Sequence, residues 1–245
     1  MLTKMDGTVA SGIYSAAYRL FQIFIIIPQS FVYSLFPIIS KKFGGEGKSF
    51  QETVERGIRY LLFFSIPMTV LMIVLAKPVI FLLYGQKFFE SITVLKILML
   101  TIIPYSITVM MGYTLVASNL QKYDMMINGA SVLANATLNY FLISRFGYNG
   151  AAAATFLSIC FYLIFQYPIV RKYLFHIHFG KYIVKPLLAS LVVGILLFYL
   201  INWNVFLNIG IGIVFYLAVL YFLSYYDYEE KLYFRQLVLA VKRMQ

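Results

Sequence analysis

The sequence contains few of the groups on which soluble enzymes depend. Only 12% of its 245 residues are charged, nine residues are acidic, and there are two histidines and one cysteine. The single cysteine, Cys160, cannot form a disulfide within the chain. A water-soluble domain usually has about 25% charged residues, because charged side chains cover most of its surface. The shortage of charge therefore argues against a soluble fold.

The reactive residues that are present follow no recognisable catalytic or metal-binding pattern. His176 and His178 form an isolated pair, with no cysteine or carboxylate at ligand spacing. There is no serine-hydrolase elbow and no phosphate-binding glycine loop. The nine carboxylates are expected in loops or at helix ends, so no buried pair is predicted for acid–base catalysis. The sequence therefore predicts a protein that is not an enzyme and that holds no metal or cofactor.

Long apolar segments are abundant instead. Hydrophobic residues make up 62% of the chain, and its mean hydropathy is +0.83. A helix needs about 20 mainly apolar residues to cross a bilayer. Seven segments meet this length, at residues 12–40, 58–84, 92–117, 123–144, 150–170, 183–201 and 205–225. We therefore expect an all-α integral membrane protein, with a bundle of about seven transmembrane helices within residues 1–226.

The last residues, 227–245, have a different pattern. Apolar residues recur there at helical spacing, and basic residues occupy another face: Phe234, Leu237, Val238 and Val241 against Lys231, Arg235 and Lys242. This pattern predicts a cytoplasmic amphipathic helix on the anionic inner leaflet. A solvated tail is the alternative.

The distribution of positive charge predicts the orientation. The net charge is +11, and it lies in short loops between apolar segments, which favours a membrane protein over a nucleic-acid-binding one. Fourteen of the 20 Lys and Arg fall on one predicted side of the membrane and four on the other. By the positive-inside rule the C-terminus is cytoplasmic and the N-terminus lies outside, in a multi-pass protein of the cell membrane. Because no signal peptide precedes the first span, we expect a fragment or a separately encoded half-protein.

Polar residues within the first apolar segment are the main candidates for substrate binding. Ser15, Arg19, Gln22, Gln29 and Tyr33 are spaced by four, three, seven and four residues, which places them along one helical face. A charged side chain facing lipid is costly, so Arg19 is expected to face protein or a hydrated cavity. Its guanidinium suits phosphate or carboxylate. The alternative is that Arg19 extends to the outer interface or binds backbone carbonyls.

Two other segments contain polar residues. Lys96 lies one turn inside the segment 92–117, where it either lines the same cavity as Arg19, Gln22 and Gln29 or extends to the interface. Asn128, Ser131, Asn135 and Asn139 form a stripe on the segment 123–144. Such a stripe either joins membrane helices by hydrogen bonds or forms a cavity wall.

Four stretches of the sequence resemble one family in the right order. They are residues 12–20 (GIYSAAYRL), 36–41 (FPIISK), 81–88 (FLLYGQKF) and 135–155, with Asn135, Asn139, Gly147 and Gly150 at the matching positions. The family is that of the polysaccharide-biosynthesis, or O-antigen, flippases, which transport lipid-linked oligosaccharides. It belongs to the superfamily that also contains multidrug exporters. The resemblance covers about residues 1–170 and is to the C-terminal half of the family.

The resemblance implies a mechanism and partners. Members of the family have two helical bundles around a central cavity and work by alternating access. The implied partners are membrane lipid, a lipid-pyrophosphate-linked oligosaccharide and an N-terminal half-bundle. Three alternatives stay open: a multidrug or cation exporter of the same fold, a membrane glycosyltransferase or polymerase of polysaccharide assembly, and a structural subunit that transports nothing.

Overall fold

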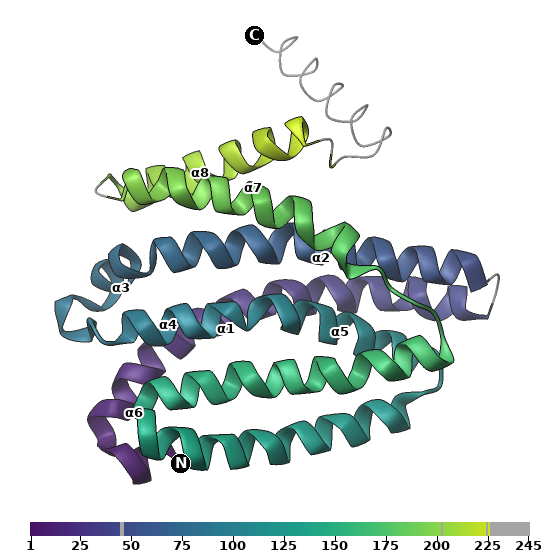
Figure 1. Ribbon diagram of the computed structural model, residues 1–245, viewed down its shortest axis with the longest axis horizontal. Helices are drawn as coiled ribbons and strands as arrows, with labels where there is room; N and C mark the ends of the chain where they lie inside the picture. The colour runs from purple at the N-terminus through teal and green to yellow at the C-terminus, as the bar shows by residue number, and fades with distance from the viewer. Residues whose placement is uncertain (45–46, 202, 224, 226–245) are drawn as a thin grey trace.

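The computed structural model describes residues 1–44, 47–201, 203–223 and 225. These residues form long helices joined by short links and contain no strand (Figure 1). The elements are α1 (Leu2–Phe43), α2 (Gly47–Val74), α3 (Ala76–Tyr84), the 3₁₀ turn η1 (Gln86–Phe88), α4 (Ser91–Leu100), α5 (Ile102–Ala117), α6 (Gln121–Tyr173), α7 (Phe179–Tyr199) and α8 (Val205–Phe222). The prediction of an all-α membrane bundle is confirmed. The predicted amphipathic tail, 227–245, lies outside the described residues.

Six stretches of the described chain are long and apolar enough to cross a membrane. One of them, α6, is 53 residues long and reverses direction at Gly147, whose φ is +54°. Glycine adopts this backbone conformation without a steric penalty. A Cβ at Gly150 would overlap the carbonyl oxygen of Leu142, so the turn is tightly packed. The α6 hairpin therefore contains the two predicted spans 123–144 and 150–170 as antiparallel arms (Figure 1).

Two predicted helices are interrupted just before a proline. The predicted span 58–84 divides into α2 and α3 at Leu75, and Pro78 is the third residue of α3. The predicted span 92–117 divides into α4 and α5 at Thr101, and Pro104 is the third residue of α5. Proline is tolerated in a first helical turn, because its missing N–H would have no partner there.

The predicted beginning of the second span was wrong. The region 41–57 was expected to be mainly a loop, because of its charged residues. In the structure α2 begins at Gly47, eleven residues before the expected start. Glu52 and Glu55 are therefore helical residues well inside α2 rather than residues of a loop or a helix end. At 28 residues, α2 is about 42 Å long, so its first turns extend beyond a hydrocarbon core of about 30 Å.

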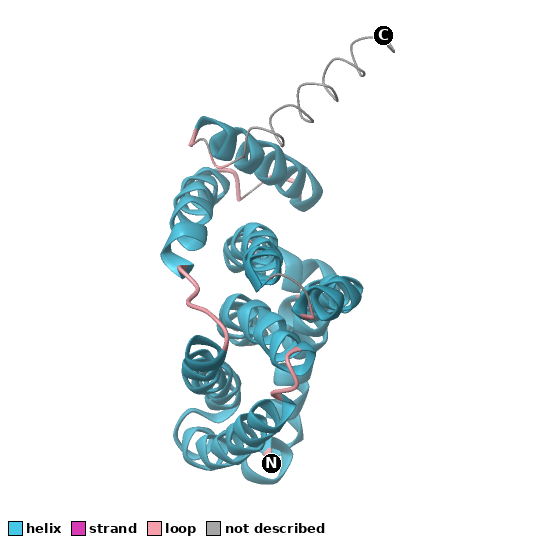
Figure 2. Cartoon of the chain, turned by 90° about the vertical axis from the view of Figure 1, so that its right-hand side faces the viewer, coloured by secondary structure: helices cyan, strands magenta, loops and turns pink. Residues whose placement is uncertain are grey.

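Burial is greatest in the middle of the bundle. In the stretch Ser91–Ala117, 56% of the most apolar window is buried. One apolar cluster joins α1 to α2, α3 and α4, and a second joins α1 and α2 to α5. A third cluster attaches α7 and α8 to α2. Figures 1 and 2 both show α7 and α8 on one side of the bundle and the α6 hairpin on the other.

The links between helices group by charge. Figure 1 shows the α1–α2, α5–α6 and α6–α7 links at one end of the bundle. We call this the basic end, because its links and adjoining turns contain Lys41, Lys42, Lys122, Arg171 and Lys172. The turn of the α6 hairpin and the α7–α8 link lie at the other end.

Candidate functional site

The outward face of α1 is polar along much of its length. The buried residues of α1 include Ala17, Phe21, Pro28 and Val32, which lie on one face. At about 100° per residue, the polar residues predicted from the sequence fall on the opposite face, together with Ile26. We call this set the α1 polar face; its members are Ser15, Arg19, Gln22, Ile26, Gln29 and Tyr33.

The α1 polar face is exposed at some positions and half-buried at Ser15 and Gln29. Arg19 and Gln22 are exposed, and Ile26 is 59% exposed. The Gln29 amide donates a hydrogen bond to the Tyr33 hydroxyl. The Tyr33 ring packs edge-on against Tyr113 of α5, with the ring centroids 5.2 Å apart. At one end of the α1 polar face, Tyr33 is thus held by contacts with Gln29 and Tyr113. The side chains of Arg19 and Gln22 remain exposed.

Lipid is a poor environment for this face. An arginine at the centre of a transmembrane helix costs about 2.5–3.5 kcal/mol on insertion scales, so such residues usually face a bundle interior or water. A guanidinium group next to amide groups on one helix face can bind an anion that carries sugars. The guanidinium makes charge-assisted hydrogen bonds and the amides make neutral ones. The α1 polar face is the candidate functional site.

The other predicted basic residue, Lys96, lies on a different helix. Its side chain is exposed on α4, next to the fully buried Leu95. Arg19, Gln22 and Gln29 share one face of α1, whereas Lys96 would have to reach any common cavity from α4.

The asparagine stripe of α6 lies mainly between the arms of the hairpin. Asn135 donates to the Ser158 hydroxyl across the hairpin at 2.9 Å, and Asn139 donates to the Asn135 carbonyl at 2.9 Å. Ser131, in the same stripe, donates to the Ser158 carbonyl at 2.9 Å. Asn128 is exposed. Asn135 thus makes interhelical hydrogen bonds in this structure.

One carboxylate is held in a way that the sequence did not predict. The Tyr162 hydroxyl and the Gln166 amide donate to the same Asp124 carboxylate oxygen, at 2.8 and 2.7 Å. Asp124 lies in the first turn of α6, as expected for an acidic residue at a helix end. The sequence feature that could have indicated this contact is Gln166 itself, a polar residue within the apolar segment 150–170. In the structure Gln166 is fully buried, and a buried amide needs a polar partner.

An apolar groove lies beside α1. It has a volume of about 420 Å³ and is bordered by α1, α2, α7 and α8. Phe24 and Ile27 line it from α1, Phe64 and Met68 from α2, and Ile213 from α8. Ser190 also borders it, but the Ser190 hydroxyl donates to the Pro186 carbonyl at 2.7 Å. This apolar groove has the size of a small-molecule pocket and a lining suited to hydrocarbon.

Two similar proteins are flippases by name. The chain is 29% identical over 148 residues to a probable low-salt glycan biosynthesis flippase, Agl15, of Haloferax volcanii; the match covers 60% of this chain and 31% of that protein. A solved structure of the lipid II flippase MurJ, in an inward closed conformation, superimposes with a TM-score of 0.71 at 20% identity. That superposition covers 97% of this chain and 52% of the solved one. The chain thus spans about half or less of the length of these relatives.

A family model described as lipid II flippase MurJ matches residues 2–223. The match covers nearly every described residue, including the α1 polar face, the α6 hairpin and α8. It confirms that the chain is related to lipid flippases, and it agrees with the prediction that the chain is not an enzyme. The match does not confirm the O-antigen family that the sequence motifs predicted. This multi-pass membrane chain belongs to the MurJ family of lipid II flippases.

Proposed function

We propose that this chain forms part of a flippase that moves a lipid-linked oligosaccharide or polysaccharide precursor across the cell membrane. The observation that carries the proposal is the α1 polar face, with Arg19 and Gln22 exposed in a helix that is long and apolar enough to cross a membrane. The family match and the glycan flippase from Haloferax volcanii support the substrate class.

The polar face and the apolar groove suit the two parts of such a substrate. The Arg19 guanidinium can bind a pyrophosphate through two parallel hydrogen bonds, and Gln22 and Gln29 can bind sugar hydroxyls. The apolar groove on another flank of α1 can hold part of the lipid tail. A substrate placed in this way exposes its head group to water and its tail to hydrocarbon, which is the separation that flipping must maintain.

We further propose that the α1 polar face lines a cavity shared with a second helical bundle. The relatives are longer than this chain, and a polar outward face needs protein or water beside it. Rocking of one bundle against the other would open the cavity to each side of the membrane in turn. On the positive-inside rule, the basic end and the C-terminus are in the cytoplasm, which a reporter fused after residue 245 would test.

Substitution of Arg19 tests the transport proposal. Arg19→Ala should slow appearance of the lipid-linked precursor in the outer leaflet about tenfold to a hundredfold, as expected for loss of hydrogen bonds to a charged group. Arg19→Lys should retain part of the activity, because lysine keeps the charge but not the planar fork. The assay uses membrane vesicles from cells that carry each variant at its own locus, so any partner is present.

The matched control is Arg145→Ala, which removes an exposed cation near the turn of the α6 hairpin. It should leave transport unchanged. If Arg19→Ala vesicles contain normal amounts of protein and flip the precursor at the wild-type rate, Arg19 does not bind the substrate and the proposal loses its main support.

A further inference from the structure

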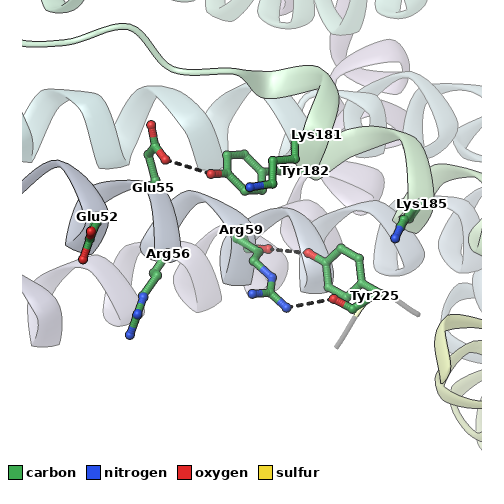
Figure 3. Close-up of a pocket in the computed structure, with 8 residues that line it drawn as sticks. All are labelled: Glu52, Glu55, Arg56, Arg59, Lys181, Tyr182, Lys185 and Tyr225. Carbon is green, nitrogen blue, oxygen red and sulfur yellow. Dashed lines mark hydrogen bonds between the residues drawn. The ribbon is translucent and has the colours of Figure 1, made fainter. Parts of the chain in front are cut away.

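A second polar pocket lies away from the α1 polar face, between α2 and α7. Its volume is about 310 Å³, at the lower end of the range for small-ligand sites. Arg56 and Arg59 line it from α2, and Lys181 and Lys185 line it from α7. Figure 3 shows these side chains together with the other residues that line the pocket. We call it the basic pocket.

Tyr225 connects the wall of the basic pocket to α2. The Arg59 guanidinium donates to the Tyr225 carbonyl at 2.9 Å, and the Tyr225 hydroxyl donates to the Arg59 carbonyl at 3.3 Å (Figure 3). The same guanidinium lies 4.9 Å from the centre of the Tyr225 ring. Arg59 therefore has a structural part in forming the pocket. Arg56 and Lys181 are exposed at its rim.

Among the described residues that line the pocket, the basic ones outnumber the acidic ones. The acidic residues there are Glu52 and Glu55, and the basic ones are Arg56, Arg59, Lys181 and Lys185. The Glu55 carboxylate accepts hydrogen bonds from the Tyr182 hydroxyl at 2.8 Å and from the Gln51 amide at 3.0 Å. Glu55 is thus engaged by neutral donors that hold it in place. Glu52 is exposed, one helical turn from Arg56. The balance favours an anion.

We expect the basic pocket to lie at the depth of lipid head groups. It involves the first turns of α7 and the third turn of α2, at the basic end of the bundle. Arg19 lies 24 residues before the end of α1, and Arg56 lies nine residues after the start of α2. The two sites are therefore roughly 20 Å apart along the helix axes, which separates this pocket from the proposed transport site.

We propose that the basic pocket binds a phosphate group, supplied by the head group of an anionic phospholipid in the leaflet at the basic end. Arginine and lysine near a membrane surface attract anionic lipids, and the guanidinium of Arg56 matches phosphate geometry. A phosphate held between Arg56 and Lys181 bridges α2 to α7. It thereby attaches the peripheral α7–α8 pair to the central bundle. The inference does not require the chain to transport a substrate.

The test measures binding of dioleoyl phosphatidylglycerol to the purified protein in detergent, by native mass spectrometry. The test variant is Arg56→Gln/Lys181→Gln, which removes one cation from each helix and leaves Arg59 and Tyr225 intact. It should bind phosphatidylglycerol about thirtyfold more weakly, since each surface cation contributes about a factor of five. The matched control is Arg171→Gln/Lys172→Gln, which removes two cations at the same end of the bundle but outside the pocket; its affinity should fall less than about threefold.

A third variant distinguishes loss of the binding site from loss of folding. Glu52→Gln removes an exposed negative charge from the pocket lining, so it should strengthen phosphatidylglycerol binding about threefold. A misfolded protein could not show this gain. The proposal is overturned if the Arg56→Gln/Lys181→Gln and Arg171→Gln/Lys172→Gln variants lose affinity equally, or if Glu52→Gln has no effect.

Two further probes identify the source of the phosphate. Dioleoyl phosphatidylcholine, which is zwitterionic, should bind weakly and equally to all variants. Inorganic phosphate at millimolar concentration should not displace phosphatidylglycerol if a lipid is the ligand. Displacement by inorganic phosphate, together with loss of that effect in Arg56→Gln/Lys181→Gln, would support the phosphate site but assign it to a soluble anion.

Discussion

α1 and α8 are similarly exposed but differ in what their outward faces contain. Only 17% of the most apolar window of α1 and 22% of that of α8 are buried. The outward face of α8 consists mainly of large apolar side chains, including Phe206, Val214 and Phe222. The outward face of α1 has the polar residues Arg19 and Gln22 near the middle of the helix. The two helices are therefore exposed to a similar extent, but their outward faces require different surroundings.

The residues on the outward face of a membrane helix indicate whether lipid, protein or water lies beside it. An apolar outward face is satisfied by lipid, since no hydrogen-bonding group is left without a partner. A polar outward face at membrane depth is satisfied only by protein or water. On the function proposed above, α8 should face lipid and α1 should face the cavity shared with the second bundle. The following predictions test that contrast.

The largest expected effect comes from placing a charge on each face. Val214 is 70% exposed at the middle of α8, and Ile26 is 59% exposed within the α1 polar face. Val214→Arg should destabilise the inserted protein by about 3 kcal/mol, because the charge would face lipid. Ile26→Arg should cost less than about 1 kcal/mol, because its surroundings are already polar. The measurement is the amount of folded protein in membranes, and equal losses for the two variants would contradict the contrast.

An intermediate effect is expected in water accessibility. In a Cys160→Ser background, Gln22→Cys should react with a membrane-permeant maleimide at least about tenfold faster than Val214→Cys, because thiolate forms poorly in hydrocarbon. The rates are read by mass shift in intact vesicles. A Gln22→Cys rate as slow as that of Val214→Cys would mean that α1 also faces lipid or is covered by tightly packed protein.

The smallest effect distinguishes polar residues inside the bundle from those outside it. Asn135→Leu should lower stability by about 1 kcal/mol, because Ser158 loses a hydrogen-bond partner across the α6 hairpin. Gln22→Leu should leave stability unchanged within about 0.5 kcal/mol and should reduce transport instead. Thermal unfolding in detergent compares the two variants. A larger loss of stability for Gln22→Leu would show that its partner lies within this chain.

More of the fold than of the site could be predicted from the sequence. The helices depend on local composition, whereas the site depends on contacts between residues far apart in the chain. Apolar segments of about 20 residues predict spans directly, so the arms of the α6 hairpin matched residues 123–144 and 150–170. The start of α2 was missed because charged residues at 47–57 look like a loop, although a helix longer than the bilayer can have a charged first part. The pairing of Asp124 with Gln166 was missed because those residues are 42 positions apart.

The same limit applies to the basic pocket. Arg56 and Arg59 are more than 120 positions from Lys181 and Lys185, so their meeting depends on how α7 packs on α2. No local pattern around either pair indicates that the two pairs lie together.

By itself, the sequence determined the all-α membrane fold and the polar face of α1, because each follows from local composition and a helical repeat of 3.6 residues. Only the tertiary structure decided which polar residues have partners. It turned Asn135 toward Ser158, joined Asp124 to Gln166 and brought α2 and α7 together around the basic pocket. It also left Arg19 and Gln22 on the outside. These outcomes depend on contacts between residues far apart in the chain, and no local pattern contains that information.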